Sequence, residues 1–466
     1  MLICLLVVDA GGVFEAAARS RYVRRSRRLA RGVRLVRIID RRGPKRIKVL
    51  KVDPGLQPTL DVALANGAIP GHERTSSMAR RHHALAAING DFTVRPTLRG
   101  AGRPVNTFAV DGVLATSPLI WGRNFAISKD ETRTYVGHAP LGTLLVQRDA
   151  RALEIRGWNT WQGERGPYAY TRSGGRAFRP PLRSCSARLV PTGDRVWRPR
   201  RPGVRRRYTV EVVRCSYRRL WRKNGMVIAA RRGTTAARTI SSTLRPGEVV
   251  NVTWFLERWA GILDTVGGNP TLLERGRVSI GRCTSSYFCR RNPRTGIGVT
   301  PSGKLLLVTV DGRSRRSVGI KLGGFAHLFS RLGAEWALNL DGGGSTTMVI
   351  RGRVVNNPSD PGGERAVGSA VLVLGRKDRG ERRRLEPASL ESLSTSGDMS
   401  PRSAALEVFD PGSTGGMLDA MVRGDLGRRQ PLTPVLSRVL TTYRRHADQA
   451  RVLSSNARFT RSRKGP

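Results

Sequence analysis

Acidic side chains that follow directly on apolar runs are the residues with which this chain could do chemistry. Asp341 follows the run 335–340 and precedes three glycines and a Ser-Thr-Thr cluster. Glycines let backbone N–H groups face a bound anion, and the hydroxyl groups add further donors. A glycine turn between two strands is the simpler interpretation. However, so many half-buried polar groups are costly unless a ligand satisfies them.

A second acid follows a second run in the same way. Asp311 comes after residues 305–310, and between the two runs an apolar stripe at i, i+3, i+4 and i+7 predicts a helix over 318–333. Strand, helix and strand predict a right-handed parallel crossover, so both acids should lie at one edge of a sheet. Their separation there is ~5 Å if the strands are neighbours and ~10 Å if one strand intervenes.

A third strand end brings further polar groups. The pattern predicts a helix over 75–83 and a strand over 84–88, followed by Asn89-Gly90-Asp91. Arginine forks bind phosphate well, and carboxylates stabilise either a positively charged sugar-like transition state or a hard cation. Because both residue types are expected at this edge, they indicate a sugar joined to phosphate. The arginines concerned are Arg294, Arg313 and Arg365.

The elements that must position these groups extend over most of the chain. Strands are expected over 33–52, a hairpin about Asp111-Gly112, short strands over 141–250 with a basic insertion at 195–207, and a closing strand at 370–374. A helical stripe is expected over 259–266. We therefore expect an α/β (α+β mixed) fold, with a mixed β-sheet core, packed helices and hairpins. Residues 1–31 read as a signal-like, basic leader, residues 32–375 as the catalytic domain and residues 376–466 as a largely disordered tail.

The balance of charge favours anionic partners. The 466 residues carry 83 basic and 34 acidic side chains, a formal net charge of +49. Such a field attracts polyanions, although arginine is spread over every segment and compositional bias explains much of it. No zinc-finger, basic-zipper or ribonucleoprotein motif is present, so specific nucleic-acid binding is not expected. Peripheral association with anionic surfaces remains an expectation.

The five cysteines favour an oxidising compartment. Cys283 and Cys289 flank one loop, Cys185 and Cys215 bracket a region of short strands, and Cys4 lies apart. Two local disulfides, 185–215 and 283–289, suit this arrangement, and four unpaired cysteines are the alternative. The apolar run 2–8 is short for a signal peptide and reads as a truncated one. We therefore expect a secreted protein located outside the cell or in the cell envelope.

Familiar catalytic signatures are missing from the sequence. There is no Gly-x-Ser-x-Gly elbow, His-Glu-x-x-His helix or dinucleotide-binding loop, and the loop 342–347 lacks the lysine of a P-loop. Six histidines without a helical ligand pair argue against a histidine-built metal site. No cofactor is expected with certainty, and a divalent cation held by acids stays open.

Six short motifs in a fixed order provide a more specific signal. They are Ala87-Ile88-Asn89-Gly90-Asp91-Phe92, Gly267-Gly268-Asn269-Pro270, Asn292-Pro293-Arg294-Thr295-Gly296-Ile297-Gly298, Val310-Asp311-Gly312-Arg313, Asn339-Leu340-Asp341-Gly342-Gly343-Gly344-Ser345-Thr346-Thr347 and Pro358-Ser359-Asp360. Over residues 84–374 the chain thus resembles the phosphodiester glycosidase family. The resemblance implies a mixed α/β domain that hydrolyses a glycosidic bond to a phosphate oxygen and releases free sugar and a phosphomonoester.

The resemblance also implies site roles. Asp341 is expected to stabilise or attack the anomeric carbon or to activate water, and Asp311 to orient water or partner groups. Arg294 and Arg313 are expected to hold the phosphate. Further substrate contacts are expected from Asn89, Asp91, Asn269, Thr295, Asn339, Gly342, Gly343, Ser345, Thr346 and Arg365.

Two alternatives stay open from the sequence. The first is a phosphodiesterase that releases sugar-1-phosphate with a cation held by Asp311 and Asp341. The second is a non-catalytic protein that binds anionic polysaccharide of the cell envelope. In each case the partner is a sugar-phosphate glycan or an anionic cell-wall polymer.

Overall fold

The computed structural model describes most of residues 22–375. The gaps within this range are 42, 57, 70, 95–99, 120–121, 129–130, 132, 147–151, 161–165, 193–203, 217–219, 221–224, 258, 260 and 282–287. The expected signal-like segment, most of the basic insertion at 195–207 and the tail after 375 lie outside the described residues. Within the described part of the chain, no helix has the length and apolar character needed to cross a membrane.

A central eight-stranded sheet forms the frame of the candidate site. Its strand order is β1-β2-β3-β23-β22-β24-β20-β21. The strands are β1 (Tyr22–Ala30), β2 (Val33–Asp40), β3 (Lys45–Val52), β20 (Thr271–Glu274), β21 (Arg277–Val278), β22 (Arg294–Val299), β23 (Leu305–Val310) and β24 (Trp336–Asn339). Both β23 and β24 pair antiparallel with β22, so they run parallel to each other with one strand between them.

This topology confirms the expected parallel crossover from 305 to 340 and, of the two spacings left open, has the one with an intervening strand. Helix α3 (Leu322–Arg331) connects β23 to β24 and packs on one face of the sheet through Phe325 and Phe329. The carboxyl ends of β23 and β24 therefore meet at one edge, together with the first residue of β22, Arg294. One strand intervenes, which places the two chain ends ~10 Å apart.

A five-stranded sheet packs against the other face of the central sheet. Its order is β26-β25-β6-β28-β4. The strands are β4 (Thr59–Leu64), β6 (Ala86–Asn89), β25 (Met348–Ile350), β26 (Arg353–Val354) and β28 (Ser369–Leu374). Leu50 and Leu307 of the central sheet share an apolar cluster with Ile88 and Val371 of this sheet. Alternate residues of β28, such as Leu372, face outward and pack under helix α1 (Thr75–Arg81). Because both faces of β28 are buried, its sequence is continuously apolar.

The remaining elements extend the fold away from these layers. A five-stranded sheet has the order β10-β9-β19-β7-β8, and a pair β27–β5 closes beside α1. The strands are β5 (Glu73–Arg74), β7 (Phe108–Val110), β8 (Val113–Thr116), β9 (Arg123–Ser128), β10 (Thr134–His138), β19 (Ile262–Gly267) and β27 (Ala366–Val367). Short 3₁₀ turns are η1 (Ala65–Gly67), η2 (Arg172–Gly174) and η3 (Gly343–Ser345).

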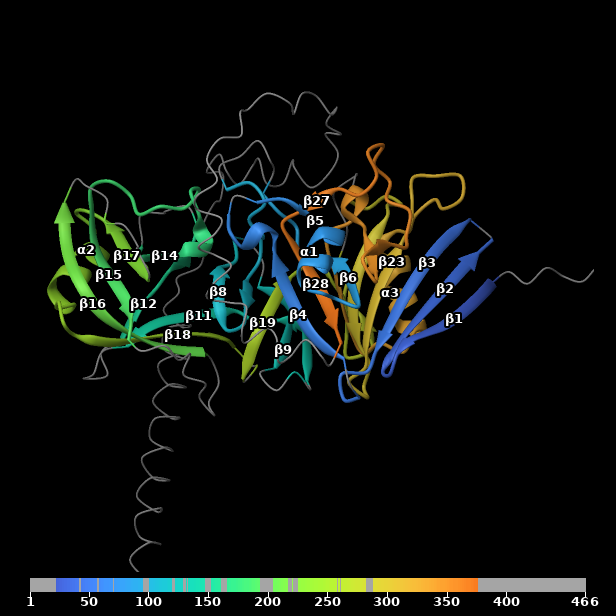
Figure 1. The fold of residues 1–466 in the computed structure, drawn as a ribbon, viewed down its shortest axis with the longest axis horizontal. Helices are drawn as coiled ribbons and strands as arrows, with labels where there is room; N and C mark the ends of the chain where they lie inside the picture. The colour runs from blue at the N-terminus through green and yellow to red at the C-terminus, as the bar shows by residue number, and fades with distance from the viewer. Residues whose placement is uncertain are drawn as a thin grey trace, which may run out of the picture.

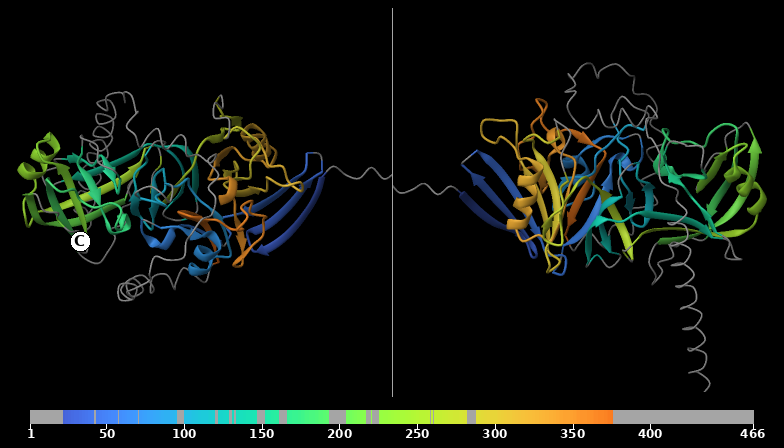
Figure 2. Two further views of the ribbon diagram at one scale, coloured as in Figure 1. Left: turned by 90° about the horizontal axis from the view of Figure 1, so that it is seen from above. Right: turned by 180° about the vertical axis from the view of Figure 1, so that it is seen from behind.

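A second eight-stranded sheet occupies one end of the molecule, opposite β1–β3 (Figure 1), and the two further views agree (Figure 2). Its order is β12-β11-β18-β16-β15-β17-β14-β13. The elements are β11 (Leu141–Val146), β12 (Ala152–Glu154), β13 (Gly157–Trp158), β14 (Tyr168–Tyr170), β15 (Ser184–Pro191), β16 (Val204–Ser216), β17 (Met226–Arg231), α2 (Thr235–Thr243) and β18 (Val249–Leu256).

Disulfide bonding in this sheet agrees with the sequence where it can be examined. Cys185 of β15 and Cys215 of β16 face each other and form the predicted disulfide. Cys289 is also disulfide-bonded, while its predicted partner Cys283 lies outside the described residues.

Two sequence expectations about elements were wrong. Residues 22–30 of the expected leader form β1, which pairs along its length with β2 and is therefore an edge of the sheet. Residues 262–267 form β19 rather than a helix, held between β9 and β7. The fold is mixed α and β as expected, but sheet dominates it strongly.

Candidate active site

Asp341 lies on the loop that follows β24, at the shared edge of the sheet. The residue as a whole is partly exposed, and its carboxylate accepts a hydrogen bond from Gly342 N at 2.9 Å and one from the Ser345 side chain. Its own backbone N–H donates to Gly90 O at 3.1 Å, which fixes the loop to the end of β6. Loss of solvation by burial raises the pKa of Asp341, and the two hydrogen bonds and the positive charge of Arg365 partly offset this rise.

An ion pair flanks this carboxylate. Arg365 Nε donates to Asp360 Oδ2 at 2.6 Å, and both side chains are partly exposed. Arg365 lowers the pKa of Asp341 while Asp360 raises it, so both charges lie close enough to act on Asp341. Gly344 packs against this pair, because a Cβ at Gly344 would overlap both the Asp360 carboxylate and the Arg365 guanidinium.

Arg313 completes the cationic side of the loop. Its side chain is exposed, and its guanidinium lies against Gly343, where an ideal Cβ would be 3.2 Å from Nη2. Gly343 has a φ of +61°, a conformation that a residue with a side chain rarely adopts. Arg313 and Arg365 thus both border the loop that presents Asp341, and either could hold a phosphate there.

Asn89 has a different position from the one expected. Its side chain is fully buried and donates to Asp341 O at 2.8 Å. Its Oδ1 accepts from Thr295 Oγ1 at 2.7 Å and from Thr347 N at 3.0 Å. Because these protein groups use the amide of Asn89, it joins β6, β22 and the Asp341 loop instead of facing a substrate.

Asp91 is a second buried acid near Asp341. Asn106 donates to it twice, from its backbone N at 2.7 Å and from Nδ2 at 2.8 Å. Burial raises the pKa of Asp91 to about 7, and the charge of Asp341 contributes to the rise. Two carboxyl groups that influence each other this way suit proton transfer near neutral pH.

Asp311 lies at the same edge, but its carboxylate is already occupied. Lys48 Nζ of β3 forms an ion pair with Oδ2 at 2.6 Å, and Asn357 N donates to Oδ1 at 3.1 Å. The side chain is 1% exposed. This geometry makes Asp311 a group that positions the 357–360 segment, rather than one that orients water beside the substrate.

Arg294 is buried and directed toward carbonyl groups. It donates to Phe288 O at 2.5 Å, to Arg290 O at 3.3 Å and to Ile320 O at 3.4 Å. Only 2% of the residue is exposed. A guanidinium held in this way stabilises the 288–294 segment, and the sequence could not distinguish it from a phosphate ligand.

The other expected contacts fall into two groups. Asn269 Oδ1 accepts a hydrogen bond from the Arg123 side chain at 3.3 Å. Asn339 Nδ2 donates to Asn269 O at 2.8 Å, which joins the segment after β24 to the segment after β19. Several buried oxygens around the loop lack a hydrogen-bond partner among the described residues, and these are the atoms that a bound sugar hydroxyl could satisfy. They are Asn339 Oδ1, Thr346 Oγ1, Thr347 Oγ1 and Ser359 Oγ.

The structure therefore brings together most of the expected residues and changes several of their roles. Asp341, Ser345, Gly342, Gly343, Arg313 and Arg365 border one loop, whereas Asn89, Thr295, Asp311 and Arg294 support it from below. Asp360 and Lys48 received no role from the sequence. The Pro358-Ser359-Asp360 motif was a signal for the first, and nothing local marks Lys48, whose partner is 263 positions away.

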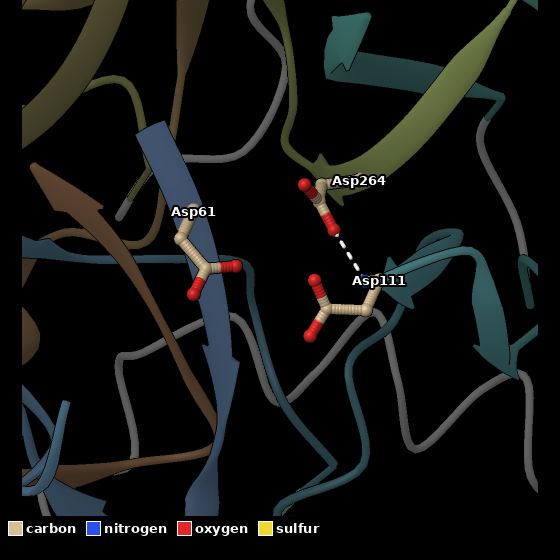
Figure 3. A group of neighbouring side chains, drawn as sticks. All are labelled: Asp61, Asp111 and Asp264. Carbon is tan, nitrogen blue, oxygen red and sulfur yellow. Dashed lines mark hydrogen bonds between the residues drawn. The ribbon is translucent and has the colours of Figure 1, made fainter. Parts of the chain in front are cut away.

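A possible cation site lies elsewhere in the fold. Asp61 of β4, Asp111 of the β7–β8 turn and Asp264 of β19 point toward one another (Figure 3), with ligand oxygens within 4.8 Å. Carboxylate oxygens are the ligands that hard cations prefer, so these three residues could hold one. Burial and the neighbouring charges of Asp61 and Asp111 raise the pKa of Asp264 well above its ordinary value.

Part of the chain that includes this edge of the sheet matches a known family model. Residues 207–374 match the family model described as phosphodiester glycosidase. The chain is 40% identical over 106 residues to the SPbeta prophage-derived uncharacterized protein YomE of Bacillus subtilis, covering 23% of this chain and 16% of that protein. It is 40% identical over 67 residues to an N-acetylglucosamine-1-phosphodiester alpha-N-acetylglucosaminidase of Bos taurus, covering 14% of this chain and 12% of the relative. The matched segments are thus a small part of each relative's length.

Solved structures extend the likeness in fold beyond this segment. A hypothetical protein from Synechocystis superposes with a TM-score of 0.59 at 21% identity, covering 74% of this chain and 62% of that one. A protein of Burkholderia pseudomallei named as exported gives a TM-score of 0.52 at 23% identity, covering 71% and 74%. The likeness in fold therefore includes segments that precede residue 207.

Proposed function

We propose that the protein hydrolyses the glycosidic bond of a sugar-1-phosphodiester, because residues 207–374 match the phosphodiester glycosidase family model. The products are a free sugar and a phosphomonoester. The main observation in support is Asp341, a partly exposed residue whose carboxylate lies among Ser345, Arg365 and the loop bordered by Arg313. Residues 32–375 constitute the catalytic domain in this proposal.

The reaction breaks the bond between the anomeric carbon and the phosphate oxygen. The oxygen of water is added to the anomeric carbon, and the phosphate leaves with the electron pair of the broken bond. Asp341 stabilises the positive charge that develops on the sugar, attacks the anomeric carbon or activates the water. A phosphate leaving group is acidic enough to require little protonation, so the proposal assigns no general acid.

Cations at the rim would hold the phosphate. Arg313 and Arg365 present guanidinium groups beside the glycine loop, where charge-assisted hydrogen bonds to phosphate oxygens are favourable. Asp91 is 1% exposed and bonded through both oxygens to Asn106, so it would act on the reaction through its charge, which interacts with that of Asp341. Asp311 and Arg294 would position these groups without touching the substrate.

The decisive experiment is a panel of sugar-1-phosphodiesters hydrolysed in ¹⁸O-labelled water. We expect the label in the sugar and not in the phosphate, and Asp341→Asn should lower turnover by at least about a thousandfold, as for loss of a catalytic carboxylate. Glu274→Gln, a change of an exposed acid at the end of β20, serves as the control. Label in the phosphate, or full activity of Asp341→Asn, would reject the proposal.

The alternative of a cation-dependent phosphodiesterase is disfavoured by one observation. Its cation requires free carboxylate oxygens on Asp311, which are already bonded to Lys48 and to the backbone of Asn357. The ¹⁸O experiment also tests this alternative, because cleavage of the phosphorus–oxygen bond releases sugar-1-phosphate.

We further propose a setting outside the cytoplasm. The Cys185–Cys215 disulfide requires an oxidising compartment to persist, and a structural neighbour is named as an exported protein. A sugar-phosphate glycan or an anionic polymer of the cell envelope is the substrate class that fits this setting and the chain's net charge of +49.

A further inference from the structure

Three cationic side chains lie in a row across β1, β2 and β3, the strands at one edge of the central sheet. The strand registers place Arg28 of β1 opposite Arg34 of β2, and Arg34 opposite Lys51 of β3. The row continues to Leu306 of β23, so all these side chains lie on the face that α3 covers further along. The helix ends at Arg331, and Leu332 occupies its C-cap position.

A cavity of about 430 Å³ lies over this row. Arg31 and Lys304 add two more cations to its lining, and Leu306 and Leu332 add apolar side chains from the face on which α3 packs. Asp53 is the acid of the lining, and its carboxylate faces Lys304 at 3.8 Å and accepts from Gly55 N at 3.3 Å. Five cations and one acid thus surround a space large enough for a phosphate and its substituents.

The row has an energetic cost in the free protein. Like charges directly opposite on neighbouring strands destabilise a sheet. Among the described residues, no carboxylate forms an ion pair with Arg28, Arg34 or Lys51, and Arg34 Nη1 donates to the neutral Ser26 Oγ at 3.3 Å. Burial, with the charges of Arg24 and Lys304, lowers the pKa of Lys51. A bound anion would relieve all of these interactions.

We propose that this cavity, formed by Arg28, Arg31, Arg34, Lys51 and Lys304, binds a phosphate group of an anionic phosphodiester polymer. The inference rests on the proposed function for the identity of the polymer and names its substrate class as a chain with repeated phosphates. The cavity and Asp341 lie at opposite ends of the sheet. Along β23, Leu306 is separated from Asp311 by five residues, or roughly 17 Å.

That spacing explains why a polymer is a better occupant than a single phosphate. A chain with a phosphate in every repeating unit can place one phosphate at the Asp341 loop and a later one in the cavity. Two contacts on one ligand increase affinity through effective concentration, without any new contact at the reacting bond. The cavity would therefore retain the polymer between successive cleavages.

Binding of a poly(glycerol phosphate) oligomer, measured by calorimetry, tests the proposal. The full chain with Asp341→Asn is used so that turnover does not interfere. We expect Arg28→Gln/Arg34→Gln to weaken binding at least tenfold and to reduce the slope of log K against log[salt] by about two, one for each cation removed.

The matched control is Arg25→Gln/Arg37→Gln. These two arginines also face each other across β1 and β2 and are equally exposed, but they lie outside the cavity lining. We expect them to change affinity less than threefold. Equal losses in the two double variants would mean diffuse attraction by net charge and would overturn the proposal.

Two further ligands distinguish the sources of phosphate. Vesicles containing phosphatidylglycerol and a single-stranded oligonucleotide should not show a tenfold dependence on Arg28 and Arg34. A loss as large as that for the polymer would assign the cavity to lipid or nucleic acid and reject the polymer. If the polymer binds as expected while no sugar-1-phosphodiester is hydrolysed, the proposed function fails and the cavity assignment stands.

Discussion

At the scale of single residues, the loop after β24 depends on the absence of side chains. Gly344 packs directly on the Asp360–Arg365 ion pair, whose two charges act on Asp341. Any residue with a Cβ would separate that pair or displace the loop, and either change would alter the charge around Asp341.

Replacement of Gly344 should therefore impair both activity and stability. We expect Gly344→Ala to reduce turnover of a sugar-1-phosphodiester at least tenfold and to lower the free energy of unfolding by about 1–3 kcal/mol, the usual cost of overpacking. Gly323→Ala is the control, because an added Cβ there meets open space on α3. Normal kinetics of Gly344→Ala would show that the ion pair is not needed.

Asp91 leads to a prediction about pH. Its pKa in the folded protein is about 7 against an ordinary 3.8, so the folded state binds a proton that the unfolded chain releases. Its contribution to stability is therefore complete below pH 4 and is lost as the pH rises toward 7.

The comparison of wild type with Asp91→Asn isolates this contribution, because asparagine does not titrate. We expect the difference in unfolding free energy, wild type minus variant, to fall by on the order of 3 kcal/mol between pH 5 and pH 8. Urea denaturation at both pH values measures it. A difference that stays constant would mean that Asp91 is ionised throughout this range.

The sequence identified which residues reach the site more reliably than what each one does there. Motif order and apolar runs predicted the positions of Asp341, Arg313 and Asn89 at one edge. They could not predict that Asn89 points toward the backbone of Asp341, or that carbonyl groups surround Arg294. Such directions depend on neighbours contributed by distant segments, and no local pattern contains them.

At the scale of elements, the contact between β3 and β23 supports the site through one buried ion pair. Lys48 and Asp311 are 9% and 1% exposed, and the two strands pair in register beside them. Removal of one partner leaves an uncompensated charge in the interior, which typically costs about 3–5 kcal/mol.

A double-mutant cycle should reveal this dependence. We expect Lys48→Met to destabilise the protein by about 3–5 kcal/mol and Asp311→Asn by a similar amount, with the double variant less destabilised than the sum of the two. Chemical denaturation of the three variants gives the coupling energy. Strictly additive effects would indicate that the pair does not interact in solution.

Helices and strands were predicted correctly where the apolar pattern in the sequence was long, and incorrectly where it was short. The runs 305–310 and 335–340 and the stripe between them became β23, β24 and α3, because three long signals agree with one another. The stripe over 259–266 became β19, since a short apolar run cannot distinguish helix from strand without knowledge of its neighbours. β1 was not predicted because its many exposed arginines show no apolar alternation. It forms a strand through its pairing with β2, which the local sequence does not reveal.

At the scale of the whole molecule, one covalent bond stabilises the sheet that lies opposite β1–β3. Cys185 and Cys215 are 30 positions apart, so their disulfide restricts a loop of about that length in the unfolded chain. We expect Cys185→Ser/Cys215→Ser to lose about 3–4 kcal/mol of stability. Hydrogen exchange should locate the loss in β15–β17, and unchanged protection there would contradict this role.

The position of β6 has a consequence for how the protein is made. This strand lies between β25 and β28, and Asn89 contacts Asp341 across 252 positions of sequence. During synthesis β6 emerges long before either neighbour exists, so the nascent chain has a high contact order and folds slowly. A nascent chain that ends before β28 (Ser369–Leu374) lacks a neighbour of β6, so the edge that presents Asn89 and Asp341 can assemble only after that strand has been translated.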